Sequence, residues 1–223
     1  MAIIASNLQH LRGRIEAAAG ARKVDLLAVS KGQPAQAIRE AFAAGQRLFG
    51  ESYVQEALEK ARQLRDLAIE WHFIGPIQSN KTKPIAENFA WVHSVERSKV
   101  AARLAASRPR ELLPLNICLQ VNVSAEPGKA GAAPAELLQL ASQVATLAGL
   151  RLRGLMTIPE LTACVELQRQ RFAQLRSLSD MLSAHGLQVD TLSMGMSADW
   201  EAAIEQGATL VRLGTAIFGE RKK

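Results

Sequence analysis

Eight short apolar runs, each followed by a stretch with helical spacing, divide this 223-residue sequence into repeating units. Short apolar runs predict buried strands, here at residues 26–30, 47–50, 71–75, 91–95, 115–123, 150–156, 191–193 and 210–213. Helices are predicted at residues 4–19, 34–44, 53–67, 81–88, 97–106, 134–147, 161–184 and 198–206, with a short helical turn after Thr215. Strict alternation of strand and helix is typical of a parallel sheet.

Eight such units predict an α/β fold consisting of one (β/α)8 TIM-type barrel with an extra N-terminal helix. The main rival is a doubly wound open sheet. Against it, the first predicted strand is not followed by G-x-G-x-x-G, the signature of the dinucleotide-binding version of that fold. The sequence also has no linker that would separate a second domain, so we expect residues 1–223 to form a single domain.

The composition argues against several classes of protein. Hydrophobic residues make up 48% and charged residues 22%, which is enough apolar content to bury a core and argues against disorder. The formal net charge of +6 comes from 27 Lys+Arg and 21 Asp+Glu, which are spread along the chain except for the run Arg221-Lys222-Lys223. With few aromatic residues and no binding motif, a solvated basic surface is favoured over nucleic-acid binding.

Membrane, secreted and metal-binding classes find no support either. No segment approaches the roughly 18 uninterrupted apolar residues that span a bilayer. Residues 1–14 lack the apolar run of a signal peptide, so we expect a cytoplasmic protein without membrane association. Cys118 and Cys164 are then expected to be thiols. The four histidines are scattered without zinc-ligand spacing, and no metal site is expected.

Lys31 is the first candidate for chemistry, because it comes directly after the first predicted strand. Active sites of such barrels lie at the C-terminal ends of the strands. Partial desolvation beside apolar walls favours the neutral amine of a lysine, which can attack an aldehyde and form a Schiff base. Position alone supports equally well a surface lysine that happens to follow a strand.

The loops after the last two strands resemble a phosphate site, which such barrels often build there. Gly195 and Ser197 follow the seventh strand, and Gly214 and Thr215 follow the eighth. Glycine, hydroxyl groups and exposed N–H groups can bind phosphate without a lysine. The simpler interpretation is helix capping by Ser197 and Thr215, but the occurrence of the pattern at both expected positions favours a phosphate.

Arg212 lies two residues before Gly214 and so faces the same side of the eighth strand. A charge inside a barrel needs a partner, which could be a phosphate, a ring nitrogen or a carboxylate elsewhere in the barrel. A reactive lysine and a phosphate cradle together indicate a phosphorylated aldehyde. Pyridoxal phosphate (PLP) and a phosphosugar both fit this description.

Seven motifs, in order along nearly the whole chain, are more specific. They are LLAVSK at 26–31, FGESYVQEA at 49–57, WHFIGPIQSNK at 71–81, HSVERSK at 93–99, QVNVSAEPGKAG at 120–131, RGLMTIP at 153–159 and LSMGMSADWEAAIEQGATLVRLGTAIFG at 192–219. On these motifs the chain resembles the pyridoxal phosphate homeostasis protein family, whose barrel is similar to the N-terminal domain of alanine racemase. The resemblance implies that PLP is the cofactor and that Lys31 holds it as a Schiff base.

The same resemblance implies phosphate contacts from Ser197, Gly214 and Thr215 and assigns the strand-eight arginine to Arg212. Two positions depart from the family pattern. The family usually reads GENY where this chain has Ser52, which keeps a hydroxyl group but lacks the amide. We expect Ser52 to contact the cofactor, but the family's asparagine contact does not by itself imply this.

The second departure is Gly32, which replaces a bulkier residue after the lysine and is expected to loosen the turn. Other residues have a structural interpretation beside a functional one. His72 is expected to be a hydrogen-bonded core histidine, and Asn80 a cap for the helix starting at residue 81. Lys129 is expected to be a solvated loop lysine that could also attract an anionic cofactor. Met156, which ends the sixth strand, packs near the cofactor ring or in the core.

Three functions follow. The resemblance favours a PLP-binding protein of intracellular PLP homeostasis, which buffers the cofactor or delivers it to PLP-dependent apo-enzymes, is not an enzyme, and is a monomer. The alternatives are a PLP-dependent amino-acid racemase and a phosphosugar enzyme that uses Lys31. Racemases with this barrel pair the lysine with a tyrosine from a second domain. This sequence ends at Lys223 after the eighth unit, with Tyr53 as its one tyrosine, so we expect no useful racemisation.

Overall fold

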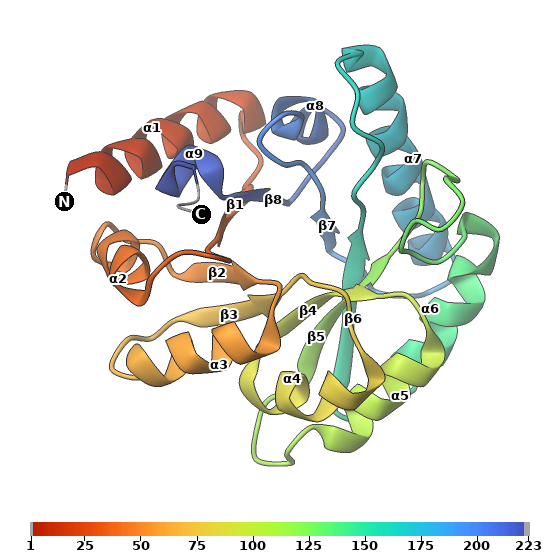
Figure 1. The fold of residues 1–223 in the computed structure, drawn as a ribbon. Helices are drawn as coiled ribbons and strands as arrows, with labels where there is room; N and C mark the ends of the chain where they lie inside the picture. The colour runs from red at the N-terminus through yellow and green to blue at the C-terminus, as the bar shows by residue number, and fades with distance from the viewer. Residues whose placement is uncertain (1, 221–223) are drawn as a thin grey trace.

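The predicted barrel is confirmed in a computed structural model, which describes residues 2–220. The strands pair in parallel and in chain order, and β1 closes the barrel by pairing with β8. Helices surround them (Figure 1). The strands are β1 (Asp25–Val29), β2 (Leu48–Glu51), β3 (Glu70–Phe73), β4 (Trp91–Val95), β5 (Leu115–Gln120), β6 (Leu150–Met156), β7 (Thr191–Ser193) and β8 (Leu210–Leu213). The basic run at residues 221–223 lies outside the described residues.

A helix follows each strand, and those after β1 to β7 return the chain to the amino end of the next strand. These helices are α2 (Ala35–Ala43), α3 (Val54–Gln63), α4 (Thr82–Asn88), α5 (Ser98–Ser107), α6 (Leu137–Ala145), α7 (Val165–Ala184), α8 (Trp200–Glu205) and α9 (Thr215–Phe218). Short 3-10 turns, η1 (Ser79–Lys81) and η2 (Pro134–Glu136), precede α4 and α6. In α2, Ile38 and Ala41 are buried three residues apart, the spacing that turns one helix face toward the strands.

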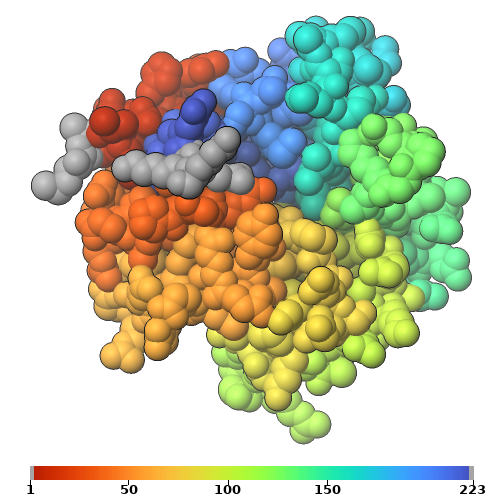
Figure 2. Space-filling view, in the orientation of Figure 1, coloured from red at the N-terminus to blue at the C-terminus, as the bar shows by residue number. Residues whose placement is uncertain are grey.

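The N-terminal helix α1 (Ala2–Ala19) is the predicted addition to the barrel, and it packs against α8 and α9. Leu8, Leu11 and Ile15 form its buried stripe. The Asn7 side chain donates a hydrogen bond of 3.0 Å to the carbonyl oxygen of Ile217 in α9. The first and last segments of the chain therefore lie side by side over the seam between β1 and β8, where Figure 2 shows them in red and blue.

Several predicted boundaries of strands and helices are wrong. The strand predicted to reach residue 123 ends at Gln120. The N–H group of Val121 still donates to the carbonyl oxygen of Met156, but Val121 pairs in an isolated bridge with Ala132 outside the strands. The helix predicted from residue 161 begins at Val165. Asn80 does not cap a helix: it lies in η1, and α4 begins at Thr82 after Lys81, whose side chain makes no capping hydrogen bond.

The interior of the barrel combines an apolar cluster with buried polar groups. Trp91, Cys118 and Met156 pack together there. Burial raises the pKa of the Cys118 thiol to about 12. Cys164 is exposed, and neither cysteine forms a disulfide. Among residues 2–220, no helix combines the length and the apolar character needed to cross a membrane.

Candidate functional site

Lys31 lies on a tight turn at the carboxyl end of β1. The N–H group of Gln33 donates a hydrogen bond of 3.0 Å to the carbonyl oxygen of Ser30, which closes a four-residue turn with Lys31 second and Gly32 third. Gly32 has φ 73°. A turn with positive φ at its third residue is one that glycine forms without strain. Gly32 therefore suits this turn, although we expected it to loosen the chain.

A cavity of about 180 Å³ lies beside this turn. Six of the seven predicted site residues line it: Lys31, Ser52, Ser197, Arg212, Gly214 and Thr215. Its apolar walls include Ile74 and Ile158, which sequence analysis did not select. Ile74 is the first residue after β3 and Ile158 the second after β6, and this place near a strand end was the only signal available for them. The cavity therefore combines an amine, hydroxyl groups and a guanidinium with apolar side chains.

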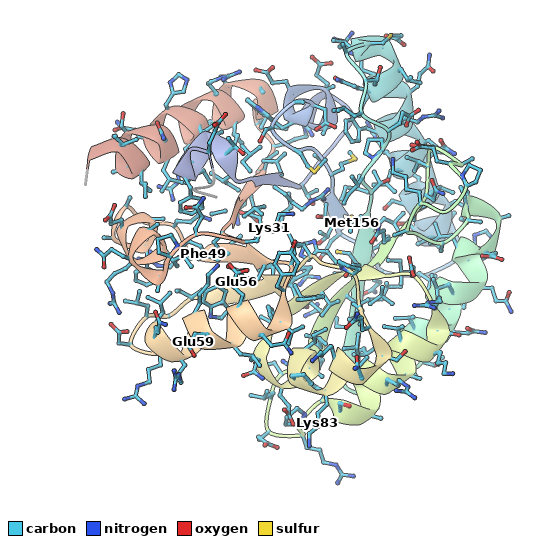
Figure 3. All side chains as sticks on the ribbon, in the orientation of Figure 1. Lys31, Phe49, Glu56, Glu59, Lys83 and Met156 are labelled. Atoms are coloured by element: carbon cyan, nitrogen blue, oxygen red, sulfur yellow. The ribbon has the colours of Figure 1, made fainter. Side chains whose placement is uncertain are left out.

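Met156 is the seventh predicted site residue, and it is not at the cavity surface. It is fully buried and packs in the cluster with Trp91 and Cys118, and Figure 3 shows it near the centre of the barrel. Ile158, two residues beyond the end of β6, packs against this cluster and lines the cavity. The structure supports the core interpretation of Met156.

The loop between β7 and α8 presents Ser197 to the cavity. Our capping interpretation of Ser197 is wrong, because α8 begins at Trp200 and Asp199 occupies the position before it. The Asp199 carboxylate accepts a hydrogen bond of 2.6 Å from the N–H group of Met196 and so holds the loop. Within residues 2–220, the backbone N–H groups of Ser197 and Ala198 donate to no backbone carbonyl. They remain available to a ligand.

Thr215 is the first residue of α9 and also lines the cavity. No side-chain hydrogen bond caps this helix, whose preceding residue is Gly214. The capping interpretation of Thr215 is therefore wrong as well. A Cβ atom at Gly214 would lie 3.0 Å from the carbonyl oxygen of Val29, so β8 and β1 approach closely where the cavity opens.

Arg212 is 4% exposed and points into the barrel. Its Nη1 donates to the carbonyl oxygen (2.5 Å) and the hydroxyl group (2.8 Å) of Ser193, and its Nη2 donates to the carbonyl oxygen of Thr157 at 2.8 Å. A carboxylate partner, one of our alternatives, is thus not what holds it. Burial lowers its pKa to about 10, against the opposing effects of Asp199 and Cys118. Arg212 stays charged at neutral pH.

From Arg212, hydrogen bonds continue across the barrel interior. The Ser193 hydroxyl group lies 2.8 Å from His93 Nδ1, and His93 Nε2 lies 2.9 Å from His72 Nδ1. His72 Nε2 lies 3.0 Å from a carboxylate oxygen of Glu70. We call Glu70, His72, His93, Ser193 and Arg212 the polar chain. His72 is the hydrogen-bonded core histidine that the sequence predicted.

The ends of the polar chain determine where its protons are. A guanidinium only donates and a carboxylate only accepts. The Ser193 hydroxyl group therefore accepts from Arg212 and donates to His93 Nδ1. His93 Nε2–H then donates to His72 Nδ1, and His72 Nε2–H donates to Glu70. Both histidines are neutral and carry their proton on Nε2.

The pKa shifts agree with this assignment. Burial lowers the pKa of His93 well below its ordinary value, and the nearby His72 and Arg212 lower it further. Burial also lowers the pKa of His72, although Glu70 opposes this. The hydrogen bond from His72 lowers the pKa of Glu70, against the effect of burial. The carboxylate is charged and both rings are neutral near pH 7.

Two other features do not form competing sites. A larger hollow of about 350 Å³ lies at the amino ends of β1 and β2, opposite to where barrels carry their sites. Its Arg12 is already bonded to the carbonyl oxygen of Ala44 and to Gln46. Lys129 lines neither cavity and pairs with Glu126 in its loop at 2.5 Å. No group of three metal-ligating side chains occurs within residues 2–220.

Comparison with known proteins agrees with this geometry. The family model for the N-terminal domain of alanine racemase matches residues 2–222. The pyridoxal phosphate homeostasis protein of Pseudomonas aeruginosa is 58% identical, over 99% of this chain and 97% of its own length. The chain belongs to the pyridoxal phosphate homeostasis protein family. The Escherichia coli member is 49% identical, over 98% of this chain and 97% of its own length.

Solved structures place the family fold in a wider group. The structure of PipY from Synechococcus elongatus with PLP bound is 42% identical, has a TM-score of 0.88, and covers 97% of this chain and 100% of its own. Alanine racemase from Corynebacterium glutamicum is 19% identical with a TM-score of 0.73. That match covers 98% of this chain but 60% of the racemase chain, and it shows a shared barrel only.

Proposed function

We propose that this protein binds PLP in the cavity beside Lys31 as a Schiff base, and that it holds the cofactor and passes it to PLP-dependent apo-enzymes rather than catalysing a reaction. The observation that carries the proposal is the position of Lys31, on a defined turn at a cavity that also receives Ser197, Arg212 and Thr215. A relative of the same fold, PipY, has been solved with PLP bound.

The lining residues match the parts of PLP. The Lys31 amine would condense with the aldehyde of PLP to give a C=N bond, and the aldehyde oxygen would leave as water with the two amine protons. The hydroxyl groups of Ser197 and Thr215, with the free N–H groups of the β7–α8 loop, suit the phosphate. Ile74 and Ile158 would supply apolar contacts to the ring. Arg212 can donate to the ring nitrogen.

An absorbance spectrum tests the proposal. The purified protein with PLP should show the visible band of a Schiff base, and Lys31→Ala should lose that band while remaining folded. A protein that stays colourless with PLP would contradict the proposal. It would favour a phosphosugar as the ligand of Lys31 instead.

A PLP-dependent racemase is the second candidate, and one observation and one consequence of the proposed binding mode argue against it. Tyr53, the one tyrosine of the chain, is 60% exposed and does not line the cavity. A guanidinium that donates to the ring nitrogen leaves that nitrogen unprotonated, which weakens the electron sink needed for carbanion chemistry. Enantiomer ratios of alanine incubated with the loaded protein test this. Turnover in the enzymatic range of roughly 1–10³ s⁻¹, lost in Lys31→Ala, would contradict a binding role.

A further inference from the structure

Three charged side chains on the neighbouring unit bond to Ser30 and Gly32, the residues on either side of Lys31. Before Lys31, the Ser30 hydroxyl group donates to Glu51 at 2.6 Å and the Ser30 carbonyl oxygen accepts from the Lys60 ammonium at 2.7 Å. After Lys31, the N–H group of Gly32 donates to Glu56 at 2.6 Å. We call Glu51, Glu56 and Lys60 the clamp.

The members of the clamp are also bonded to one another. Lys60 Nζ donates to Glu51 at 2.7 Å and to Glu56 at 2.5 Å. With its bond to Ser30, the ammonium group of Lys60 uses all three of its N–H donors. The Lys60 side chain is 7% exposed, Glu51 is fully buried and Glu56 is 29% exposed. The clamp therefore joins the end of β2 and one face of α3 to the turn of β1.

An ordinary ion pair between α3 and β2 does not account for this arrangement. Such a pair would need no contact with the turn, yet each clamp residue bonds to it directly. Burial raises the pKa of Glu51, against the effects of Lys60 and Ser30. Within residues 2–220, the second carboxylate oxygen of Glu51 is buried without a hydrogen-bond partner. A buried, half-satisfied carboxylate is unfavourable for stability alone.

We propose that the clamp is a positioning device for Lys31. By fixing Ser30 and Gly32, it holds the Cα atom of Lys31 at the cavity mouth, so that the amine reaches the aldehyde carbon of PLP without a search over backbone conformations. The clamp does not touch the ring or the phosphate in this account. It acts on the covalent link alone, and the inference therefore rests on the proposed function.

Two ligands separate this role from a general structural one. PLP can bond to Lys31, whereas pyridoxine 5′-phosphate carries an alcohol in place of the aldehyde and uses only the ring and phosphate contacts. Glu56→Ala should weaken PLP binding by about tenfold, the effect of one lost hydrogen bond to a charged group. Binding of pyridoxine 5′-phosphate should stay within about twofold of wild type, since the non-covalent contacts are intact.

The chain offers matched controls on its surface. Figure 3 shows Glu56 on the part of α3 nearest Lys31, with Glu59 and Lys83 farther out. The side chain of Glu59 is 50% exposed and that of Lys83 is 74% exposed. Glu59→Ala should bind both ligands as wild type does. Glu56→Gln keeps an oxygen that can accept from Gly32 and should restore most of the PLP affinity. Lys60→Met should repeat the Glu56→Ala pattern, with Lys83→Met as its control.

The outcomes distinguish a failure of the clamp proposal from a failure of the proposed Schiff base. If Glu56→Ala binds PLP like wild type, or loses both ligands equally, the positioning role is wrong. Glu56 decides the matter even if Lys60→Met does not fold, because its side chain is partly exposed and its replacement leaves the Lys60–Glu51 pair in place. If wild type itself binds both ligands equally, the proposed Schiff base is wrong, and the inference fails with it.

Discussion

A lysine side chain is long and flexible, so one lysine at a barrel mouth makes a defined site only where its backbone is held. In this protein the turn of residues 30–33 is closed by its own hydrogen bond and tied on both sides of Lys31 to Glu51, Glu56 and Lys60. The cavity then supplies the partners that give the site its specificity.

The hydroxyl groups of Ser197 and Thr215 are the simplest test of that specificity. Each is proposed to donate to the phosphate, so Ser197→Ala and Thr215→Ala should each weaken PLP binding by about 1–2 kcal/mol. Titration calorimetry with PLP and with pyridoxal, which lacks the phosphate, measures this. Pyridoxal should bind the two variants and wild type alike. Equal affinity of wild type for PLP and pyridoxal would show that these loops do not bind the phosphate.

Among single residues, the sequence predicts those whose side chain and place near a strand end together indicate a chemical role. Four polar residues near the carboxyl ends of strands line the cavity as predicted: Lys31, Ser197, Arg212 and Thr215. The clamp was not predicted. Glu56 and Lys60 are spaced four apart and look like a solvated helix pair, because only the packing of α3 on β1 shows that they reach the turn.

At the scale of elements, four strands contribute to the polar chain: β3 provides Glu70 and His72, β4 His93, β7 Ser193 and β8 Arg212. A single strand sequence cannot predict it, because the donors and acceptors meet only when the barrel closes. The hydrogen bonds of the polar chain give the Arg212 guanidinium at the cavity a fixed orientation. The neutral histidines of the polar chain also make the fold sensitive to acid.

The stability of the protein should fall in mild acid. Because the folded pKa of both His72 and His93 is lowered, only the unfolded chain takes up protons there below about pH 6.5. The free energy of unfolding should then drop by at most about 1.4 kcal/mol per pH unit for each histidine. Urea unfolding between pH 7.5 and 5 measures the slope. His93→Gln should reduce it, and the exposed His10→Gln should not. A flat profile would contradict the proton assignment.

The β7–α8 loop depends on Gly195, whose φ is 93° and whose added Cβ would lie 2.7 Å from the Ala203 side chain. Gly195→Ala should therefore lower the free energy of unfolding by about 1–3 kcal/mol and weaken PLP binding by displacing Ser197. Gly13→Ala is the control. A Cβ there meets no atom within 4 Å in helix α1, and it should raise stability by about 0.5–1 kcal/mol. A Gly195→Ala variant as stable as wild type would refute the loop geometry.

For the molecule as a whole, the sequence predicts the barrel well and the boundaries between strands, loops and helices less well. The alternation of apolar runs and helical stretches is repeated often enough to fix the strand number and order, and errors at single boundaries do not change it. These boundaries are set by tertiary contacts. Val121 pairs in an isolated bridge with Ala132 outside the strands, and α8 begins where Asp199, rather than Ser197, bonds back to Met196.

The central claim is that Lys31 is the residue that binds PLP covalently. Borohydride reduction of the PLP-saturated protein, followed by proteolysis and mass spectrometry of the labelled peptides, tests it most directly. We expect one reduced PLP adduct, on Lys31. An adduct on Lys81 or Lys129, a spread over many surface lysines, or no adduct at all would contradict it.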